Sequence, residues 1–230
     1  MMRILAIIST HGNESLGPSL LAYMLAKRSK LLEDIEFIIA NPRAYAKNVR
    51  YTESDLNRSY GLSLDTYEGR RAKIIEERIR LLKPELVLDF HTTTAEQPNI
   101  LITADRNNEV VQRFINASAI KDNLVVSPLN DITTVAQNFV AYEVSNSRLN
   151  DDLYEQICTD IERYLDGKMV DQERTFYKMI GKILPEEEKS IDGLENFVYN
   201  DELQAIPSFL GSKAYKQDGT YAGFKLEKLV

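Results

Sequence analysis

The chain of 230 residues contains only two histidines and one cysteine, and it has no excess of positive charge. A lone cysteine, Cys158, cannot form a disulfide within the chain, which fits a reducing compartment. The formal net charge of -7 argues against a nucleic-acid-binding surface, for which a basic patch is expected. No apolar run approaches the roughly 18 to 20 residues that span a bilayer. We therefore expect a cytoplasmic protein that binds neither nucleic acid nor membrane.

The rest of the composition is that of an ordinary globular protein. Apolar residues make up 43% of the chain and charged residues 27%. This length suits one good-sized domain, or one domain with a smaller appendage. The apolar run near the N-terminus, Ile4–Ile8, is short and no small-residue cleavage site follows it. It therefore reads as a first strand and not as a secretory signal.

Short β-branched runs alternate with helical patterns over the first two thirds of the chain. Strands are predicted at Ile4–Ile8, Ile35–Ala40, Leu86–Phe90, Ile100–Thr103, Leu124–Val126 and Phe139–Val144. Helices are predicted at Leu16–Leu31, Thr66–Leu82, Asn108–Ile120 and Asp151–Leu165. This alternation predicts an α/β fold with helices packed on both faces of a sheet.

The pattern changes after Gly167. Helical periodicity fades, and short apolar stretches are separated by glycine and proline. The acidic run Glu186–Glu188 is expected to form a solvated loop. We predict a main domain at residues 1–167 and a small, mostly β subdomain at residues 168–230.

Both histidines stand at the ends of predicted strands. His11 follows the first strand, and His91 closes the third. Ligands of α/β sheets gather beyond the carboxyl ends of the strands, so both imidazoles would share one edge if these strands are neighbours. Glu14 follows His11 by three residues on a loop that opens a helix, where Gly12 gives the backbone freedom for a sharp turn.

Two imidazoles and one carboxylate form the ligand set that holds a catalytic zinc ion and leaves a fourth position open. We predict one Zn²⁺ per chain on His11, Glu14 and His91. The alternative is that Glu14 caps the following helix and the histidines are polar strand ends. Asp89 is close to His91 in sequence, but we expect its side chain on the opposite face of the strand. Whether it reaches round to orient an imidazole stays open.

Two arginines and an asparagine lie in the irregular stretch 50–58. Arg50, Asn57 and Arg58 suit an anionic substrate, because guanidinium groups pair with carboxylates through two parallel hydrogen bonds. An arginine near zinc can also stabilise the oxyanion formed when water attacks a carbonyl. The alternative is a surface loop held by pairs between Asp55 and the arginines.

Glu143 is an ionisable residue inside the apolar run Phe139–Val144. A buried carboxylate is unfavourable unless it is paired, protonated or close to a metal. A zinc hydrolase needs a base that takes a proton from water and returns it to the leaving nitrogen. Glu143 is our candidate for this base, and the alternative is a glutamate on a solvated strand face.

Several motifs occur in a fixed order between residues 4 and 144. They are His11-Gly12-Asn13-Glu14 followed by Gly17, then Asn41-Pro42-Arg43-Ala44, Arg50 through Asp55-Leu56-Asn57-Arg58, Asp89-Phe90-His91-Thr92-Thr93-Thr94 and Tyr142-Glu143-Val144. Together they resemble the aspartoacylase and succinylglutamate desuccinylase family, whose members are related to zinc carboxypeptidases. Further on, Ala214-Tyr215 resembles the family's late alanine–tyrosine site.

The resemblance implies a zinc carboxypeptidase-like mixed sheet flanked by helices, with zinc on the three ligands named above. It implies that Arg50 polarises the scissile amide carbonyl and that Glu143 is the general base and acid. It also implies that Asn57 and Arg58, helped by Tyr215, hold a substrate carboxylate. We therefore expect a zinc-dependent amidohydrolase, a deacylase that cleaves the amide bond of a small-molecule N-acyl amino acid or a similar carboxylate.

The chain departs from the family pattern at two positions. Thr133 stands where some members carry an arginine that binds part of the amino-acid substrate, so specificity for N-acetylaspartate is not carried over. Ser145 stands where the family often has a glycine. Two other functions stay open, a metallocarboxypeptidase acting on short peptides and a non-catalytic metal-binding protein. The sequence also leaves open whether the chain forms a homo-oligomer.

Overall fold

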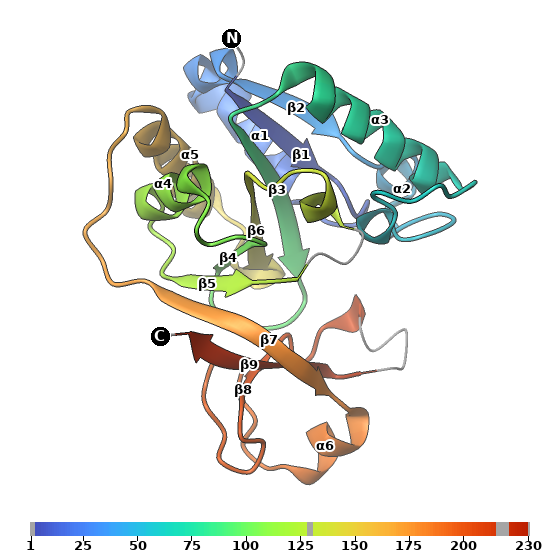
Figure 1. The fold of residues 1–230 in the computed structure, drawn as a ribbon, viewed down its shortest axis with the longest axis vertical. Helices are drawn as coiled ribbons and strands as arrows, with labels where there is room; N and C mark the ends of the chain where they lie inside the picture. Colours follow the sequence, from blue (N-terminus) through green and yellow to red (C-terminus); the bar gives the residue numbers. More distant parts are fainter. Residues whose placement is uncertain (1–2, 128–130, 215–220, 230) are drawn as a thin grey trace.

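The structure, a computed structural model, describes residues 3–127, 131–214 and 221–229. A nine-stranded sheet in the order β2-β1-β3-β6-β4-β5-β7-β9-β8 runs through these residues (Figure 1). Its strands are β1 (Ile4–Ile8), β2 (Ile35–Ile39), β3 (Leu86–Thr93), β4 (Ile100–Thr103), β5 (Asp122–Val125), β6 (Phe139–Ser145), β7 (Thr175–Ile183), β8 (Ile206–Ser208) and β9 (Gly223–Leu229). Strands β2, β1, β3 and β6 are parallel, whereas β4 is antiparallel to β6 and β9 is antiparallel to β7. The predicted mixed α/β sheet is therefore confirmed.

The helices are close to the predicted ranges. They are α1 (Leu16–Lys27), α2 (Pro42–Lys47), α3 (Tyr67–Leu82), α4 (Glu109–Ala117), α5 (Asp151–Leu165) and α6 (Pro185–Ser190), with 3-10 turns at Ser29–Glu33, Leu56–Arg58, Ile132–Thr134 and Asn146–Arg148. The prediction extended the first helix to Leu31, but α1 ends at Lys27 and a 3-10 turn follows. In the described ranges, every helix is too short or too polar to cross a lipid bilayer.

Two short helices were not predicted, although the sequence carries signals for both. Helix α2 begins at Pro42, and the side chain of Asn41 accepts a hydrogen bond from the backbone N–H of Ala44. The acidic run Glu186–Glu188, expected to be a loop, forms the first turn of α6 after Pro185. Acidic side chains at that position interact favourably with the positive end of the helix dipole, so the expectation of a loop was wrong.

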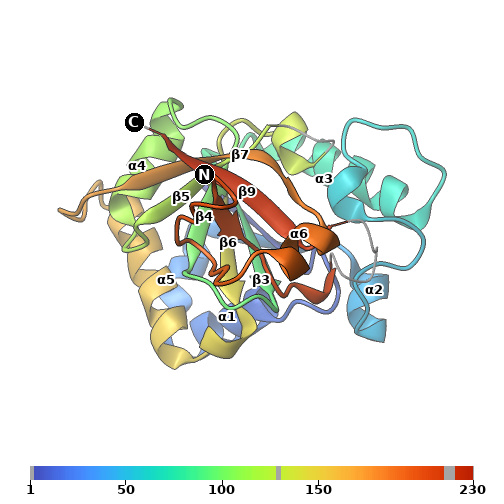
Figure 2. The same cartoon turned by 90° about the horizontal axis from the view of Figure 1, so that it is seen from below.

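Helices cover the two faces of the sheet unequally (Figure 2). Helices α1, α4 and α5 pack on one face, against alternate residues of the central strands such as Ile4, Ala6 and Ile8. On the other face, α3 packs against the β1 and β3 residues Leu5, Ile7 and Val87. The part of this second face that is formed by β6, β4, β5 and β7 instead borders a cavity of about 630 Å³.

The part of the chain after residue 167 continues the same sheet. Strand β7 pairs in parallel with β5, and β9 then pairs with both β7 and β8. The described part of residues 168–230 holds these three strands and one short helix. A separate folding unit with its boundary at residue 167 stays a prediction.

Candidate metal centre

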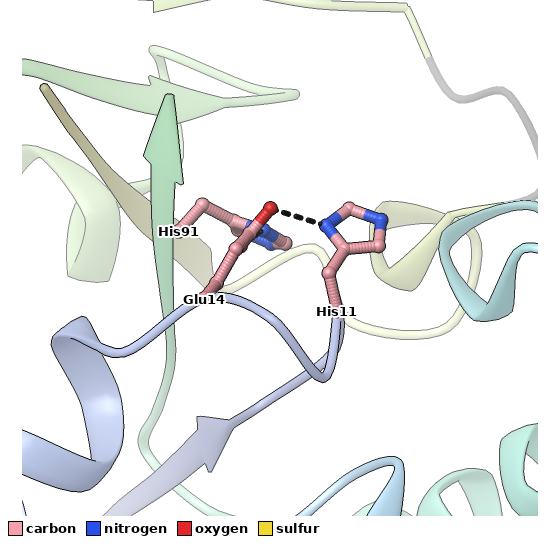
Figure 3. Close-up of side chains that lie close together, drawn as sticks. All are labelled: His11, Glu14 and His91. Atoms are coloured by element: carbon pink, nitrogen blue, oxygen red, sulfur yellow. Dashed lines mark hydrogen bonds and ion pairs between the residues drawn. The ribbon is translucent and has the colours of Figure 1, made fainter. Parts of the chain in front are cut away.

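The two histidines and Glu14 converge at one edge of the sheet (Figure 3). Strands β1 and β3 are parallel neighbours, as required for His11 and His91 to share an edge. The Nδ1 atom of His11 lies 2.7 Å from Oε1 of Glu14, and Nδ1 of His91 lies 2.9 Å from Oε2. One ligand atom from each residue lies within 4.8 Å of the other two, and all three residues are buried.

This donor set fits a zinc ion. Both Nδ1 atoms face the same carboxylate, so a metal between them would replace the two protons shared in these hydrogen bonds. Glu14 is not the cap of the following helix, because the N-cap position of α1 is Ser15 and no side chain caps it. The carboxylate of Glu14 instead contacts the two histidines, and its Oε2 also accepts a hydrogen bond from the backbone N–H of Thr92 at 3.3 Å.

Charge around the cluster determines its protonation in the absence of a metal. Burial by itself lowers the pKa of His91, but the carboxylates of Asp89 and Glu14 raise it well above its ordinary value. Burial also lowers the pKa of His11, and Glu14 and Asp55 reverse this and raise it. Burial raises the pKa of Glu14, yet the two histidines hold it below its usual range. Without a metal, these shifts favour protonated imidazoles beside an ionised carboxylate.

Two residues shape the turn that carries His11, one through its backbone conformation and the other through its lack of a side chain. Ser9 takes the left-handed conformation, with φ of 55°, and it is fully buried. Gly12 has no positive φ, so our expectation that it supplies freedom for the turn was wrong. Glycine is needed there for space, because a Cβ atom at Gly12 would lie 2.1 Å from the backbone carbon of Ala44.

Each histidine has a carboxylate on its second ring nitrogen. The Nε2 atom of His91 lies 2.9 Å from Asp89, and Nε2 of His11 lies 3.2 Å from Asp55. Such carboxylates fix the tautomer and orientation of a metal-binding imidazole. Asp89 lies on the same face of β3 as His91, contrary to our expectation, because side chains two residues apart in a strand point the same way. Thr10 in turn donates a hydrogen bond to Asp89 at 3.0 Å.

Glu143 lies beside the cluster. It occupies the position of β6 that pairs with His91 on β3. Its side chain is half-buried and lines the cavity, so it does not stand on an open solvated face. This enclosure raises the pKa of Glu143 to about 7, with a further increase from the charge of Glu14, although His91 lowers it. A carboxylate with this pKa can both accept and return a proton near neutral pH.

The stretch 50–58 is held in place by a buried carboxylate. Glu68 on α3 accepts hydrogen bonds from the backbone N–H groups of Thr52, Glu53 and Ser54 at 2.7, 3.1 and 3.2 Å. These bonds lower the pKa of Glu68 although burial raises it. A pair between Arg50 and Asp55 also exists, with Nη2 and Oδ2 separated by 3.2 Å.

The cavity gathers the predicted site residues. Its wall includes His11, Glu14, Arg50, Asn57, Arg58, His91 and Glu143. Thr133 also lines it, and its hydroxyl donates to Asp131. Ser145 is buried and donates a hydrogen bond to the backbone oxygen of Ala95 at 2.7 Å, which ties the end of β6 to the chain after β3. Tyr215 lies outside the described residues.

Sequence reasoning missed two contributors to the site. Asp55 was considered only as a partner for arginines, and no local pattern signals its contact with His11. Glu68 was not considered, because an acidic residue in the first turn of a helix is an ordinary feature. Asp89 could have been assigned, since its spacing of two from His91 in a strand places both on one face.

Solved structures share this fold. Murine aminoacylase 3 superposes with a TM-score of 0.70 at 22% sequence identity, over 99% of this chain and 95% of that chain. Succinylglutamate desuccinylase from Chromobacterium violaceum gives 0.75 at 16% identity, over 99% and 85%. At this level of identity the likeness establishes the architecture, which is that of the zinc carboxypeptidase-like α/β proteins.

The sequence identifies the family within this class. The profile of the "Succinylglutamate desuccinylase/Aspartoacylase catalytic domain" matches residues 3–148, so the chain belongs to that family. A probable aspartoacylase of Prochlorococcus marinus (strain MIT 9515) is 36% identical over 118 residues, 46% of this chain and 39% of that protein. An N-acyl-aromatic-L-amino acid amidohydrolase (carboxylate-forming) of Xenopus tropicalis is 34% identical over 106 residues, 40% of this chain and 34% of that protein. The similarity thus spans well under half of these relatives.

Proposed function

We propose that the chain is a zinc-dependent amidohydrolase that removes the acyl group from an N-acyl amino acid or a similar small carboxylate. The observation that carries the proposal is the placement of Glu143 beside the cluster of His11, Glu14 and His91 in one cavity. The names of the relatives are consistent with it, since they include aspartoacylases and an N-acyl amino acid amidohydrolase. The single buried Cys158 is consistent with a cytoplasmic location.

His11, Glu14 and His91 would hold the metal. Bound there, zinc supplies a Lewis acid for the amide carbonyl and lowers the pKa of water towards about 7. Glu143 accepts the proton of the attacking water as general base. It then donates this proton to the departing amine as general acid, a role that suits its raised pKa.

Basic residues of the cavity would bind the anionic parts of the substrate. Arg50 donates hydrogen bonds to the carbonyl oxygen as negative charge develops on it. Asn57 and Arg58 line the same cavity and would hold the substrate carboxylate, with Tyr215 as a further proposed contact. Thr133 lacks the cationic group of the arginine that some family members carry at this position, so specificity for N-acetylaspartate is not carried over to this chain.

The test is a substrate screen of the zinc-loaded protein. N-acetyl, N-succinyl and N-formyl amino acids are incubated with the protein, and release of the free amino group is measured. Short unmodified peptides are tested in the same screen, because a metallocarboxypeptidase would release their C-terminal residue. Turnover confined to N-acyl amino acids supports the proposal. Turnover confined to peptides favours the carboxypeptidase instead, and no turnover across a broad acyl panel with zinc fully bound favours a non-catalytic metal-binding protein.

A further inference from the structure

Asp55 contacts both a proposed metal ligand and the proposed carbonyl-binding arginine. Its Oδ1 atom lies 3.2 Å from Nε2 of His11, and its Oδ2 atom lies 3.2 Å from Nη2 of Arg50. We propose that Asp55 is a positioning residue that couples the metal centre to Arg50, so that one carboxylate orients both groups. This inference rests on the proposed function, because it assigns Asp55 to the same reaction.

The two carboxylate oxygens of Asp55 have different hydrogen-bond partners. Oδ1 accepts the hydrogen bond of His11 and also that of the backbone N–H of Asn57, at 2.8 Å. Oδ2 accepts from Arg50. The side chains of Asp55 and Arg50 are 21% and 27% exposed, whereas His11 is only 4% exposed. The carboxylate therefore lies between the enclosed metal ligand and the more open cavity, where a substrate carbonyl would enter.

Planar groups make this arrangement directional. An imidazole and a guanidinium each donate along fixed N–H directions, so hydrogen bonds to one carboxylate define the orientation of both. Arg50 is also near Glu14, but Nη1 and Oε1 are 3.8 Å apart, which is longer than a hydrogen bond. Of these two contacts of Arg50 with carboxylates, the one with Asp55 is the shorter and the one within hydrogen-bond distance.

Asp89 provides a matched comparison on the other histidine. It contacts Nε2 of His91 at 2.9 Å and accepts from the hydroxyl of Thr10 and the backbone N–H of Phe90. These partners lie on β3 or just after β1. These contacts link Asp89 to His91, whereas Asp55 contacts both His11 and Arg50.

Because each oxygen of Asp55 has its own partners, an isosteric substitution can break the link to Arg50 and keep the link to His11. In Asp55→Asn, the amide oxygen can replace Oδ1 and keep the bonds to His11 and Asn57. The amide NH₂ group then replaces Oδ2 and faces the N–H groups of Arg50, so only that link is broken. In Asp55→Ala, both links are broken. The two variants therefore separate the effect on the metal from the effect on Arg50.

The experiment measures zinc affinity, by competition with a chromophoric chelator, together with kcat and KM on the best N-acyl substrate of the wild type. Asp55→Asn should bind zinc within about threefold of wild type but lose kcat by about 10²-fold, as Arg50→Ala should. Adding Arg50→Ala to Asp55→Asn should cause little further loss. Asp55→Ala should in addition weaken zinc binding by about 10- to 100-fold. Asp89→Ala should also weaken zinc binding, and its effect should multiply with that of Arg50→Ala.

A second measurement compares Asp55→Asn with Arg50→Ala without depending on turnover. It is the affinity of the zinc-loaded proteins for inorganic phosphate, measured by calorimetry. Asp55→Asn and Arg50→Ala should weaken the binding of this tetrahedral anion to the same extent. Wild-type phosphate affinity and kcat in Asp55→Asn, or independent effects of Asp55→Asn and Arg50→Ala, would overturn the coupling. A wild-type protein without turnover would instead defeat the proposed function, and the zinc and phosphate measurements would still decide the role of Asp55.

Discussion

His91 and Glu143 occupy paired positions on the adjacent parallel strands β3 and β6. Paired residues of neighbouring strands point to the same face of the sheet, with the strands about 4.8 Å apart. The hydrogen-bond ladder of the sheet, and not a loop, therefore sets the distance between a proposed metal ligand and the proposed base.

Replacing Glu143 by glutamine should remove turnover and leave the metal in place. Glutamine keeps the size of the side chain but cannot accept a proton, so kcat should fall by about 10²- to 10⁴-fold. Zinc content, measured by atomic absorption, should equal that of the wild type because Glu143 is not one of the three ligands. Near-normal activity of Glu143→Gln would exclude it as the base.

Activity should depend on the ionisation of Glu143. Its pKa is raised to about 7, and only the ionised form can accept a proton. The value of kcat/KM should therefore rise with pH up to about 7 and level off above it. Zinc content must be measured at each pH, so that loss of metal in acid is not mistaken for protonation of the base. A profile that is flat between pH 5 and 8 at full zinc content contradicts this assignment.

Zinc uptake should release protons. In the metal-free protein the pKa of His91 is well above its ordinary value, and that of His11 is raised. Both nitrogens must lose their protons to bind a metal, so zinc affinity should fall as the pH is lowered from 8 to 6. Calorimetry in buffers of different ionisation enthalpy measures the released protons. A zinc affinity that does not change between pH 8 and pH 6 would contradict proton release on binding.

Substitution of Gly12 by alanine should disturb the metal site. The new Cβ atom would lie 2.1 Å from the backbone carbon of Ala44, so the turn that carries His11 must shift. We expect a loss of about 1–3 kcal/mol in the free energy of unfolding, together with weaker zinc binding. Gly181→Ala is the matched control, because the nearest atom to its Cβ is 3.8 Å away, on Lys225. Equal effects of the two substitutions on zinc binding would argue against this explanation.

The far wall of the cavity should favour substrates with an apolar group. Ile102 of β4, Leu124 of β5 and Met179 of β7 line it, several strands away from His91. Each added methylene of a substrate that is buried there should raise kcat/KM by up to about fourfold. Met179→Gln should reduce this preference, whereas Met169→Gln, at a methionine that is 73% exposed, should not. Equal preference in both variants would place the apolar group elsewhere.

Local sequence patterns predicted much of the fold. The strand at Ile4–Ile8 and the helix at Asp151–Leu165 have the predicted bounds. The strand is a continuous apolar run whose five residues are all buried, and the helix has its apolar residues at helical spacing on the buried face. The short helices α2 and α6 are too brief to show such a period, so they were missed despite their prolines and caps. The predicted boundary at residue 167 reflects a real change in local pattern, but pairing of β7 with β5 depends on contacts between distant segments.

The candidate metal ligands could be predicted because scarce residues of the right chemistry stood after apolar strands, and the parallel order of β1 and β3 brought them together. The contacts of Asp55 with His11 and Arg50, and the apolar far wall of the cavity, could not. They depend on hydrogen bonds and packing between segments far apart in the chain, which carry no local period. Sequence thus determined the chemistry available at this edge of the sheet, and only the tertiary structure decided which groups orient it and what shape of substrate it faces.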